Sequence, residues 1–165
     1  MEIGRRSLLL TVPLALAGCN VRPLHGRRQQ AQVSQPLSST RILPLANRAG
    51  QKLHNLLRDR INPYGQPSDP AYELQVSLTR TETESGLRKD ETATRITLTL
   101  TADYRLLTAR SGEVVTRGTT GAQSVFNILG NRYSSRISEG RAEEQALVLI
   151  ADSILTRLAV VLGQA

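Results

Sequence analysis

The chain holds few of the residues on which disulfide-linked or metal-centred proteins depend. Its 165 residues include one cysteine, two histidines, one phenylalanine and no tryptophan. One cysteine excludes a disulfide within the chain, and His25 and His54 are too far apart in sequence to indicate a metal site. We therefore expect a domain of modest size that is held together by packing, without a metal or a cofactor.

The sequence also lacks any recognisable catalytic constellation. It has no Gly-rich phosphate loop, no serine elbow and no clustered histidines. His54 lies beside Leu53 in a predicted helix and is expected at the helix border or in solvent. A hydrolase would need folding to bring a serine to His54, so we expect a protein that is not an enzyme, with no catalytic residues.

The single cysteine stands at the end of an N-terminal signal pattern. Arg5 and Arg6 precede an apolar run over residues 7–17, which is too short to span a bilayer but suits a secretory signal. Small residues directly before Cys19 resemble a bacterial lipobox, and the cysteine thiolate would accept a diacylglyceryl group. We therefore expect residues 1–18 to be a lipoprotein signal peptide and Cys19 to carry the lipid that anchors the mature chain to a membrane.

The chain is strongly basic, and its positive charge is carried almost entirely by arginine. The formal net charge is +7, and Lys52 and Lys89 are the only lysines. Arginine forms bidentate hydrogen bonds with phosphate and carboxylate, so this surface suits an anionic partner. Because an exported protein rarely meets nucleic acid, we expect no nucleic-acid partner and favour a phosphorylated glycolipid or an anionic membrane surface.

Residue patterns divide the mature chain into a tether and one domain. Residues 19–40 are rich in Gln, Ser and Arg and predict a lipidated tether, followed by a domain over residues 41–165. Apolar periodicity in the domain predicts strands over 41–45, 72–79, 95–106 and 113–126, and helices over 48–61 and 139–162. Asn47 is the predicted N-cap of the first helix, and Gly163 lies just beyond the last turn of the second. Gly118 and Gly121 indicate a bulge or bend in the last strand.

The order of these elements predicts the fold class. Each strand has one apolar face and each helix one apolar stripe, which favours an α+β two-layer sandwich. We expect a four-stranded, mostly antiparallel sheet covered on one face by two helices, in the order β-α-β-β-β-α. The other face is rich in Thr and Arg and can meet water or a polar partner.

Two basic segments are candidates for anion binding. Arg88 and Lys89 lie near the tip of a polar connection predicted over residues 83–91, although Asp90 and Glu91 reduce the local positive charge. Arg132 and Arg136 flank Tyr133 ahead of the last predicted helix, in and just after a loop predicted over residues 129–134.

Several short motifs, together with the order of elements, resemble the LptE family of lipopolysaccharide-assembly lipoproteins (RlpB-like). The motifs are the lipobox, Arg22-Pro23-Leu24, Asn131-Arg132-Tyr133-Ser134-Ser135, Ala142-Glu143, and Ile150-Ala151-Asp152-Ser153-Ile154 continuing to Arg157-Leu158. The family's usual Gly-Phe after the cysteine is replaced by Asn20-Val21, and its aromatic after Pro-Leu by His25.

The resemblance implies a binding and scaffold role. LptE-like proteins plug the LptD outer-membrane β-barrel, support its assembly and help to deliver lipopolysaccharide to the cell surface. The matching lipopolysaccharide-binding position here is Arg88, ahead of Thr92-Ala93, with Lys89 as its neighbour and Arg136 as a loose second match. The implied location is the outer membrane of a Gram-negative cell, lipid-anchored and facing the periplasm.

Two other functions remain open at this stage. The chain could be an accessory lipoprotein subunit of another envelope transport machine, which would share the anchor and the domain but not the barrel. It could also be a lipid-anchored periplasmic hydrolase that uses His54.

Overall fold

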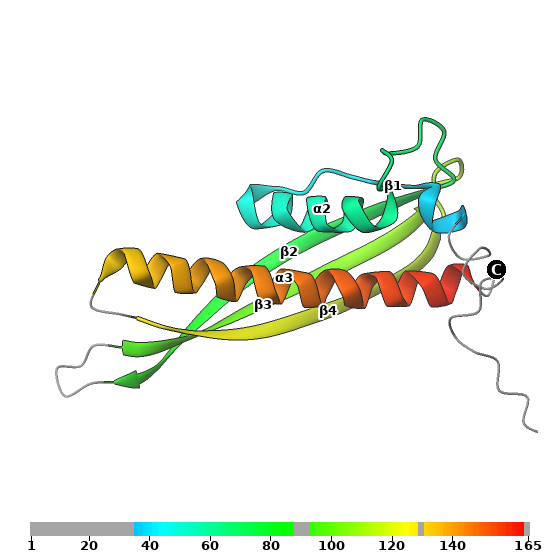
Figure 1. Ribbon diagram of the computed structural model, residues 1–165. Coiled ribbons are helices and arrows are strands. Elements are labelled where there is room, and N and C mark those ends of the chain that lie inside the picture. The colour runs from blue at the N-terminus through cyan, green and yellow to red at the C-terminus, as the bar shows by residue number, and fades with distance from the viewer. Residues whose placement is uncertain (1–34, 88–92, 129–130, 164–165) are drawn as a thin grey trace, which may run out of the picture.

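The fold is an α+β sandwich of two layers, as the sequence predicts. The computed structural model describes residues 35–87, 93–128 and 131–163. Its elements are β1 (Thr40–Ile42), α2 (Asn47–Ile61), β2 (Tyr72–Leu87), β3 (Ala93–Thr108), β4 (Val114–Asn127) and α3 (Arg132–Leu162). Both helices lie on the same face of one long, twisted sheet, and α3 runs along most of its length (Figure 1).

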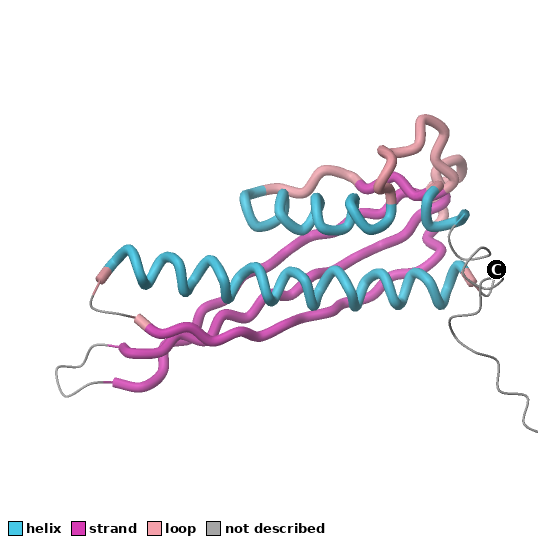
Figure 2. The backbone as a smooth tube through the Cα atoms, in the orientation of Figure 1, coloured by secondary structure: helices cyan, strands magenta, loops and turns pink. Residues whose placement is uncertain are grey.

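The four strands lie in the sheet in their order along the chain. The order is β1-β2-β3-β4, with β1 parallel to β2 and the other two pairs antiparallel. The β2–β3 pairing is continuous from Tyr72 opposite Thr108 to Ser85 opposite Arg95 and includes Leu87 opposite Ala93. The three long strands therefore form a ribbon that extends well beyond α2 (Figure 2).

The folded region begins inside the stretch predicted as tether. Residues 35–38 form a helical turn, and Thr40, which begins β1, is fully buried. Strand β1 is also shorter than the predicted strand over 41–45, because Pro44 cannot donate to a ladder and the chain leaves the sheet before it. The signal segment 1–18, Cys19 and the tether up to residue 34 lie outside the described residues.

The predicted strand facing is confirmed by the buried core. Alternate residues of β3 that face the helices are fully or almost fully buried, whereas their neighbours are exposed or half-buried. Helix α2 contributes Leu53, Leu57 and Ile61 to the same core. The buried residues of β3 are Leu98, Leu100, Ala102, Tyr104 and Leu106.

The sequence suggested a bulge or bend at Gly118 and Gly121 of β4, but the irregularity of this strand lies elsewhere. The register of β3 and β4 shifts between Leu106 and Leu107, near the start of β4. Gly118 instead lies directly opposite Tyr104, and a Cβ there would come within 2.6 Å of the tyrosine hydroxyl. Gly118 is therefore required by the buried tyrosine ring that crosses it.

Helix α2 begins at Asn47, one residue before the predicted start, so Ala46 and not Asn47 stands directly before the helix. Ala46 precedes the helix, and Asn47 has a φ of 59°. The Asn47 side-chain oxygen accepts a hydrogen bond of 2.9 Å from the backbone N–H of Gly50. Asn47 thus satisfies one of the free donors of the first turn, which is the role expected of an N-cap side chain.

Helix α3 begins two turns earlier than predicted. The predicted loop is wrong over residues 132–134 and the predicted helix start at Glu139 is wrong, because the helix begins at Arg132. Asn131, directly before it, accepts a hydrogen bond of 2.8 Å from the Tyr133 N–H. Ser135 also donates to the Asn131 carbonyl. Although α3 is long and apolar enough to cross a bilayer, its apolar face is buried against the sheet.

The long hairpin between β2 and β3 is more regular than predicted. The connection expected over residues 83–91 is partly strand, because β2 continues to Leu87 and β3 begins at Ala93. Arg88 and Lys89 lie outside the described residues.

Candidate binding site

A hollow of about 690 Å³ lies between the first half of α2, the middle of β2 and the start of α3. Because α3 begins at Arg132, its extra turns bring polar residues up to α2 and form one wall of the hollow. The lining side chains come from three elements: Asn47, Arg48, Ala49 and Lys52 of α2, Leu78 and Arg80 of β2, and Arg136, Glu139, Gly140 and Glu143 of α3.

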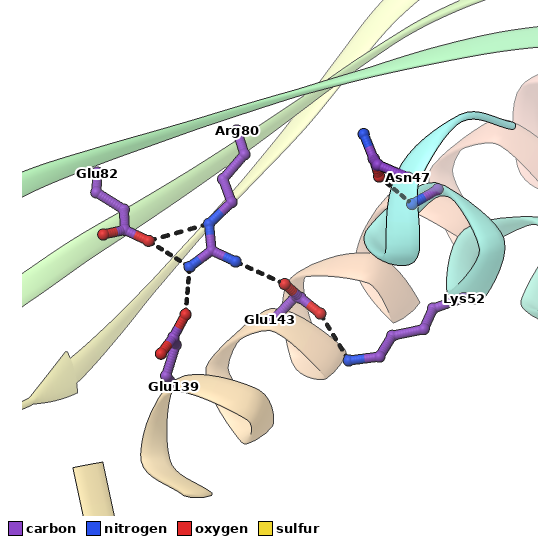
Figure 3. Close-up of polar contacts among 7 residues, drawn as sticks. Asn47, Lys52, Arg80, Glu82, Glu139 and Glu143 are labelled. Atoms are coloured by element: carbon purple, nitrogen blue, oxygen red, sulfur yellow. Dashed lines mark hydrogen bonds and ion pairs between the residues drawn. The ribbon is translucent and has the colours of Figure 1, made fainter. Parts of the chain in front are cut away.

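Arg80 is the centre of the ion-pair network in this hollow. Its Nη1 donates to Glu143 Oε2 at 2.8 Å, and its Nη2 donates to Glu139 Oε1 at 2.6 Å (Figure 3). Its Nε donates to Glu82 Oε1 at 3.0 Å, on the same strand. One guanidinium thus joins β2 to two successive turns of α3.

Glu143 extends the network to the other helix. Its second oxygen, Oε1, accepts from Lys52 Nζ at 2.6 Å (Figure 3). The Glu143 side chain is only 10% exposed, so its charge depends on these two cations for compensation. A single carboxylate therefore links α2 to β2 through α3.

The surroundings keep Arg80 positively charged. Burial lowers the pKa of its guanidinium, but the hydrogen bonds and negative charges of Glu82 and Glu139 outweigh burial. The net effect raises the pKa of Arg80 above its ordinary value. Arg80 acts here as a permanent cation, and its hydrogen-bond donors are directed to carboxylates.

Two other arginines of the hollow form no ion pair with the described residues and can therefore bind an anion. Arg48 and Arg136 are exposed, and neither forms an ion pair with any residue that the structure describes. The lining contains four basic side chains and two carboxylates, so its net charge is positive. The arrangement can hold an anion between α2 and α3 without breaking the Arg80 network.

Arg136 is the predicted site residue that the structure places in this hollow. It lies on the second turn of α3, ahead of the predicted helix start at Glu139. Arg88, Lys89 and Cys19 lie outside the described residues, so Arg136 is the one predicted site residue that the structure places.

The described residues offer no support for a metal centre or a histidine site. Among them, no three His, Cys, Asp or Glu side chains are grouped so that they could hold a metal ion. His54 is half-buried, and its Nδ1 lies 3.3 Å from the Leu43 carbonyl, to which it is hydrogen-bonded.

Sequence reasoning missed Arg80 and the carboxylates around it. The signal was present in the alternation of β2, because Arg80 and Glu82 continue the helix-facing series of Leu74, Val76 and Leu78. A strand whose inward positions change from apolar to charged indicates that a buried charge partner lies on the covering helix.

Comparison with known proteins agrees with this fold. The sequence profile of the family described as "LptE: Lipopolysaccharide-assembly" matches residues 32–158. The chain belongs to the LptE family. The match covers every strand and helix described above except the last residues of α3.

Solved structures similar to this LptE family member come from several bacteria. A candidate lipoprotein of Caulobacter crescentus is 26% identical, with a TM-score of 0.67 over 81% of this chain and 97% of that chain. Rare lipoprotein B of Shewanella oneidensis is 16% identical, with a TM-score of 0.55 over 73% and 95% of the two chains. A minor lipoprotein of Acinetobacter baumannii is 18% identical, with a TM-score of 0.54 over 74% and 92%. No curated protein matches the chain.

Proposed function

We propose that this chain is a lipid-anchored lipoprotein of the outer membrane that plugs an LptD-type β-barrel, helps it to assemble and binds lipopolysaccharide. The observation that carries the proposal is the family match over residues 32–158, which spans almost all of the described fold. The role is one of binding and support, with no chemical step.

The anchor in this proposal is the lipid on Cys19. The lipobox ending at Cys19 supports covalent lipidation, and the three similar structures named above are described as those of lipoproteins. Two or three acyl chains bury enough methylene groups to hold a protein stably on a membrane. The domain would then face the periplasm from the inner leaflet.

The uncovered face of the sheet supports a position inside a water-filled barrel. We define the open face by its central residues Thr79, Thr81, Thr97, Thr99, Thr101, Asp103 and Thr119, which are exposed or half-buried. No helix lies on this side of the sheet in the part of the chain that the structure describes (Figure 2). Short hydroxyl side chains can hydrogen-bond with water or with a polar lumen wall without an unpaired buried group.

The positive hollow supports binding of the phosphate groups of lipopolysaccharide. Arg48 and Arg136 approach it from opposite helices, and their donors are not used by carboxylates among the described residues. Arginine matches phosphate geometry through two parallel hydrogen bonds. Arg88 and Lys89 remain proposed as further contacts with the same ligand.

Capture of the barrel tests the proposed partner. The full-length tagged protein is purified from detergent-solubilised outer membranes, and co-purifying proteins are identified by mass spectrometry. We expect a β-barrel of LptD type at a one-to-one ratio. Recovery of the protein alone, or with inner-membrane transport subunits, would contradict the plug function and favour an accessory lipoprotein of another machine.

Binding assays with purified lipopolysaccharide test the proposed ligand. Arg136→Glu should weaken binding roughly tenfold, since it removes one charge-assisted contact and adds a repulsive charge. Arg88→Asp should have a similar effect. Arg157→Glu is the matched control, because Arg157 is an exposed arginine of α3 that does not line the hollow. Equal affinity of the Arg136 and Arg157 variants would contradict a lipopolysaccharide site in the hollow.

A further inference from the structure

The two outer edges of the sheet are unequal. Strand β1 pairs with β2 at Tyr72, Glu73 and Leu74, so residues 75–87 have no strand on that side within the described chain. On the opposite edge, β4 has no neighbour beyond β3 over its 14 residues within the same described part. Unpaired backbone N–H and C=O groups along an edge are a template for another strand.

The free edge of β2 carries charged side chains that discourage such pairing. Arg80, Glu82 and Glu84 occupy its helix-facing positions, and Arg80 is engaged by Glu139 and Glu143 of α3. Charged side chains that point inward at an edge are one way in which natural sheets avoid adding strands. This edge is therefore protected.

The edge formed by β4 has no comparable protection. Its helix-facing positions carry no charge, and its one charged residue, Arg117, lies opposite Arg105 on the open face. It contains no proline, and its register shift lies at its very start, opposite Leu106 and Leu107. The helix-facing residues of β4 are Thr116, Gly118, Thr120, Ala122, Ser124 and Phe126.

One hollow lies beside this edge, and a second adjoins it on α3. The first, of about 270 Å³, lies between Val125–Asn127 of β4 and the residues Ser138, Arg141, Ala142 and Gln145 of α3. The second, of about 520 Å³, is lined by residues of α3 alone: it shares Arg141 and Gln145 and adds Glu144, Val148 and Leu149. The Leu149 side chain is a large apolar group, yet the residue is 58% exposed. A strand added to β4 would place every second side chain over this flank of α3.

We propose that the outer edge of β4 takes up an extended segment of the protein partner as a fifth strand of the sheet. The inference rests on the proposed function, in which the partner is the β-barrel. Main-chain hydrogen bonds along β4 would provide affinity, and alternate apolar side chains of the segment would occupy the flank of α3 at Val148 and Leu149. The remaining side chains of the segment would be polar, because they would extend the open face.

Two variants and two matched controls test this edge in the full-length, lipidated protein. Ser124→Lys places an inward-pointing charge on β4, whereas Gln51→Lys places the same charge at an exposed residue of α2, away from β4 and from the open face. Leu149→Asp removes the apolar flank, whereas Val160→Asp makes a similar apolar-to-acidic change at a residue of α3 that is 54% exposed. Each protein is captured from solubilised outer membranes, and the bound barrel is quantified against the tagged chain.

We expect Ser124→Lys and Leu149→Asp each to reduce the captured barrel roughly tenfold, and both controls to capture it at the wild-type level. Thermal unfolding monitored by circular dichroism confirms that each variant is folded. Undiminished capture by both edge variants, with capture by the wild type, would overturn strand addition and leave the proposed function standing. Failure of the wild type to capture any barrel would overturn both.

Two further outcomes concern specificity. An equal loss in Gln51→Lys and Val160→Asp would overturn the edge as the contact. A wild-type dimer in solution that Ser124→Lys abolishes would make a second copy of the chain the occupant of the edge, and would overturn a partner strand.

Discussion

Glu143 is the residue at which three elements are joined by charge. Its two oxygens accept from cations of different elements, Lys52 of α2 and Arg80 of β2. Its side chain is 10% exposed, so little water is available to replace a lost partner. Paired buried charges contribute modestly to stability, but removal of one member leaves the others uncompensated. The stability of the helix layer should therefore be sensitive to this side chain.

Glu143→Gln should lower the free energy of unfolding by about 2 kcal/mol, because the amide keeps the shape of the carboxylate but not its charge. Urea denaturation followed by circular dichroism measures the change. Glu144→Gln is the control, since Glu144 is the adjacent, exposed residue of the same helix. Identical denaturation midpoints for the two variants would show that the network does not stabilise the fold.

At the scale of the elements, apolar periodicity was enough to predict the type and facing of the main strands and helices. Leu53, Leu57 and Ile61 form the buried stripe of α2, and the inward series of β3 is buried as predicted. These segments are predictable because each buries one face against the same core, so that the local pattern and the tertiary environment agree.

The start of α3 and the end of β2 could not be predicted in the same way. Residues 132–140 contain three serines and Gly140, which are typical of a loop, and Gly costs about 1 kcal/mol in a helix. Continuity with a long buried helix and the Asn131 cap offset that cost. In β2, inward positions become charged after Leu78, so periodicity of apolar residues ends although the strand continues. Only the contacts between Arg80 and α3 reveal why those charges face inward.

Leu100→Asp should abolish cooperative folding, because Leu100 is fully buried in the strand between β2 and β4. Loss of the leucine side chain alone costs about 3 kcal/mol, and an unpaired buried carboxylate adds several more, against a total stability of about 5–15 kcal/mol. Thr101→Asp is the control, because the next residue faces the open side. A sharp thermal transition in the Leu100 variant would refute the facing of β3.

The whole molecule presents three surfaces of different chemistry. The positive hollow lies between α2, β2 and α3, on the helix side of the sheet. The hydroxyl-rich open face belongs to the other side. Figures 1 and 2 show that no described helix covers that side, and β4 forms the edge between the two sides. Under the proposed function these surfaces suit phosphate groups, a wet lumen and a partner strand, respectively. Because they do not overlap, one domain could make all three contacts at once, provided that its anchor holds it at the membrane.

The anchor gives a prediction for the whole molecule. Cells fed an alkyne analogue of palmitate should label the wild-type protein, and Cys19→Ala should lose the label completely, because the chain has no second cysteine to accept a diacylglyceryl group. Asn20→Ala is the matched control and should keep the label, since it leaves the thiol in place. Labelling is read after capture and fluorescent coupling, alongside fractionation of the membranes. Persistent labelling of the Cys19 variant would show that the lipid is attached elsewhere, whereas an unlabelled wild type would contradict a lipid anchor.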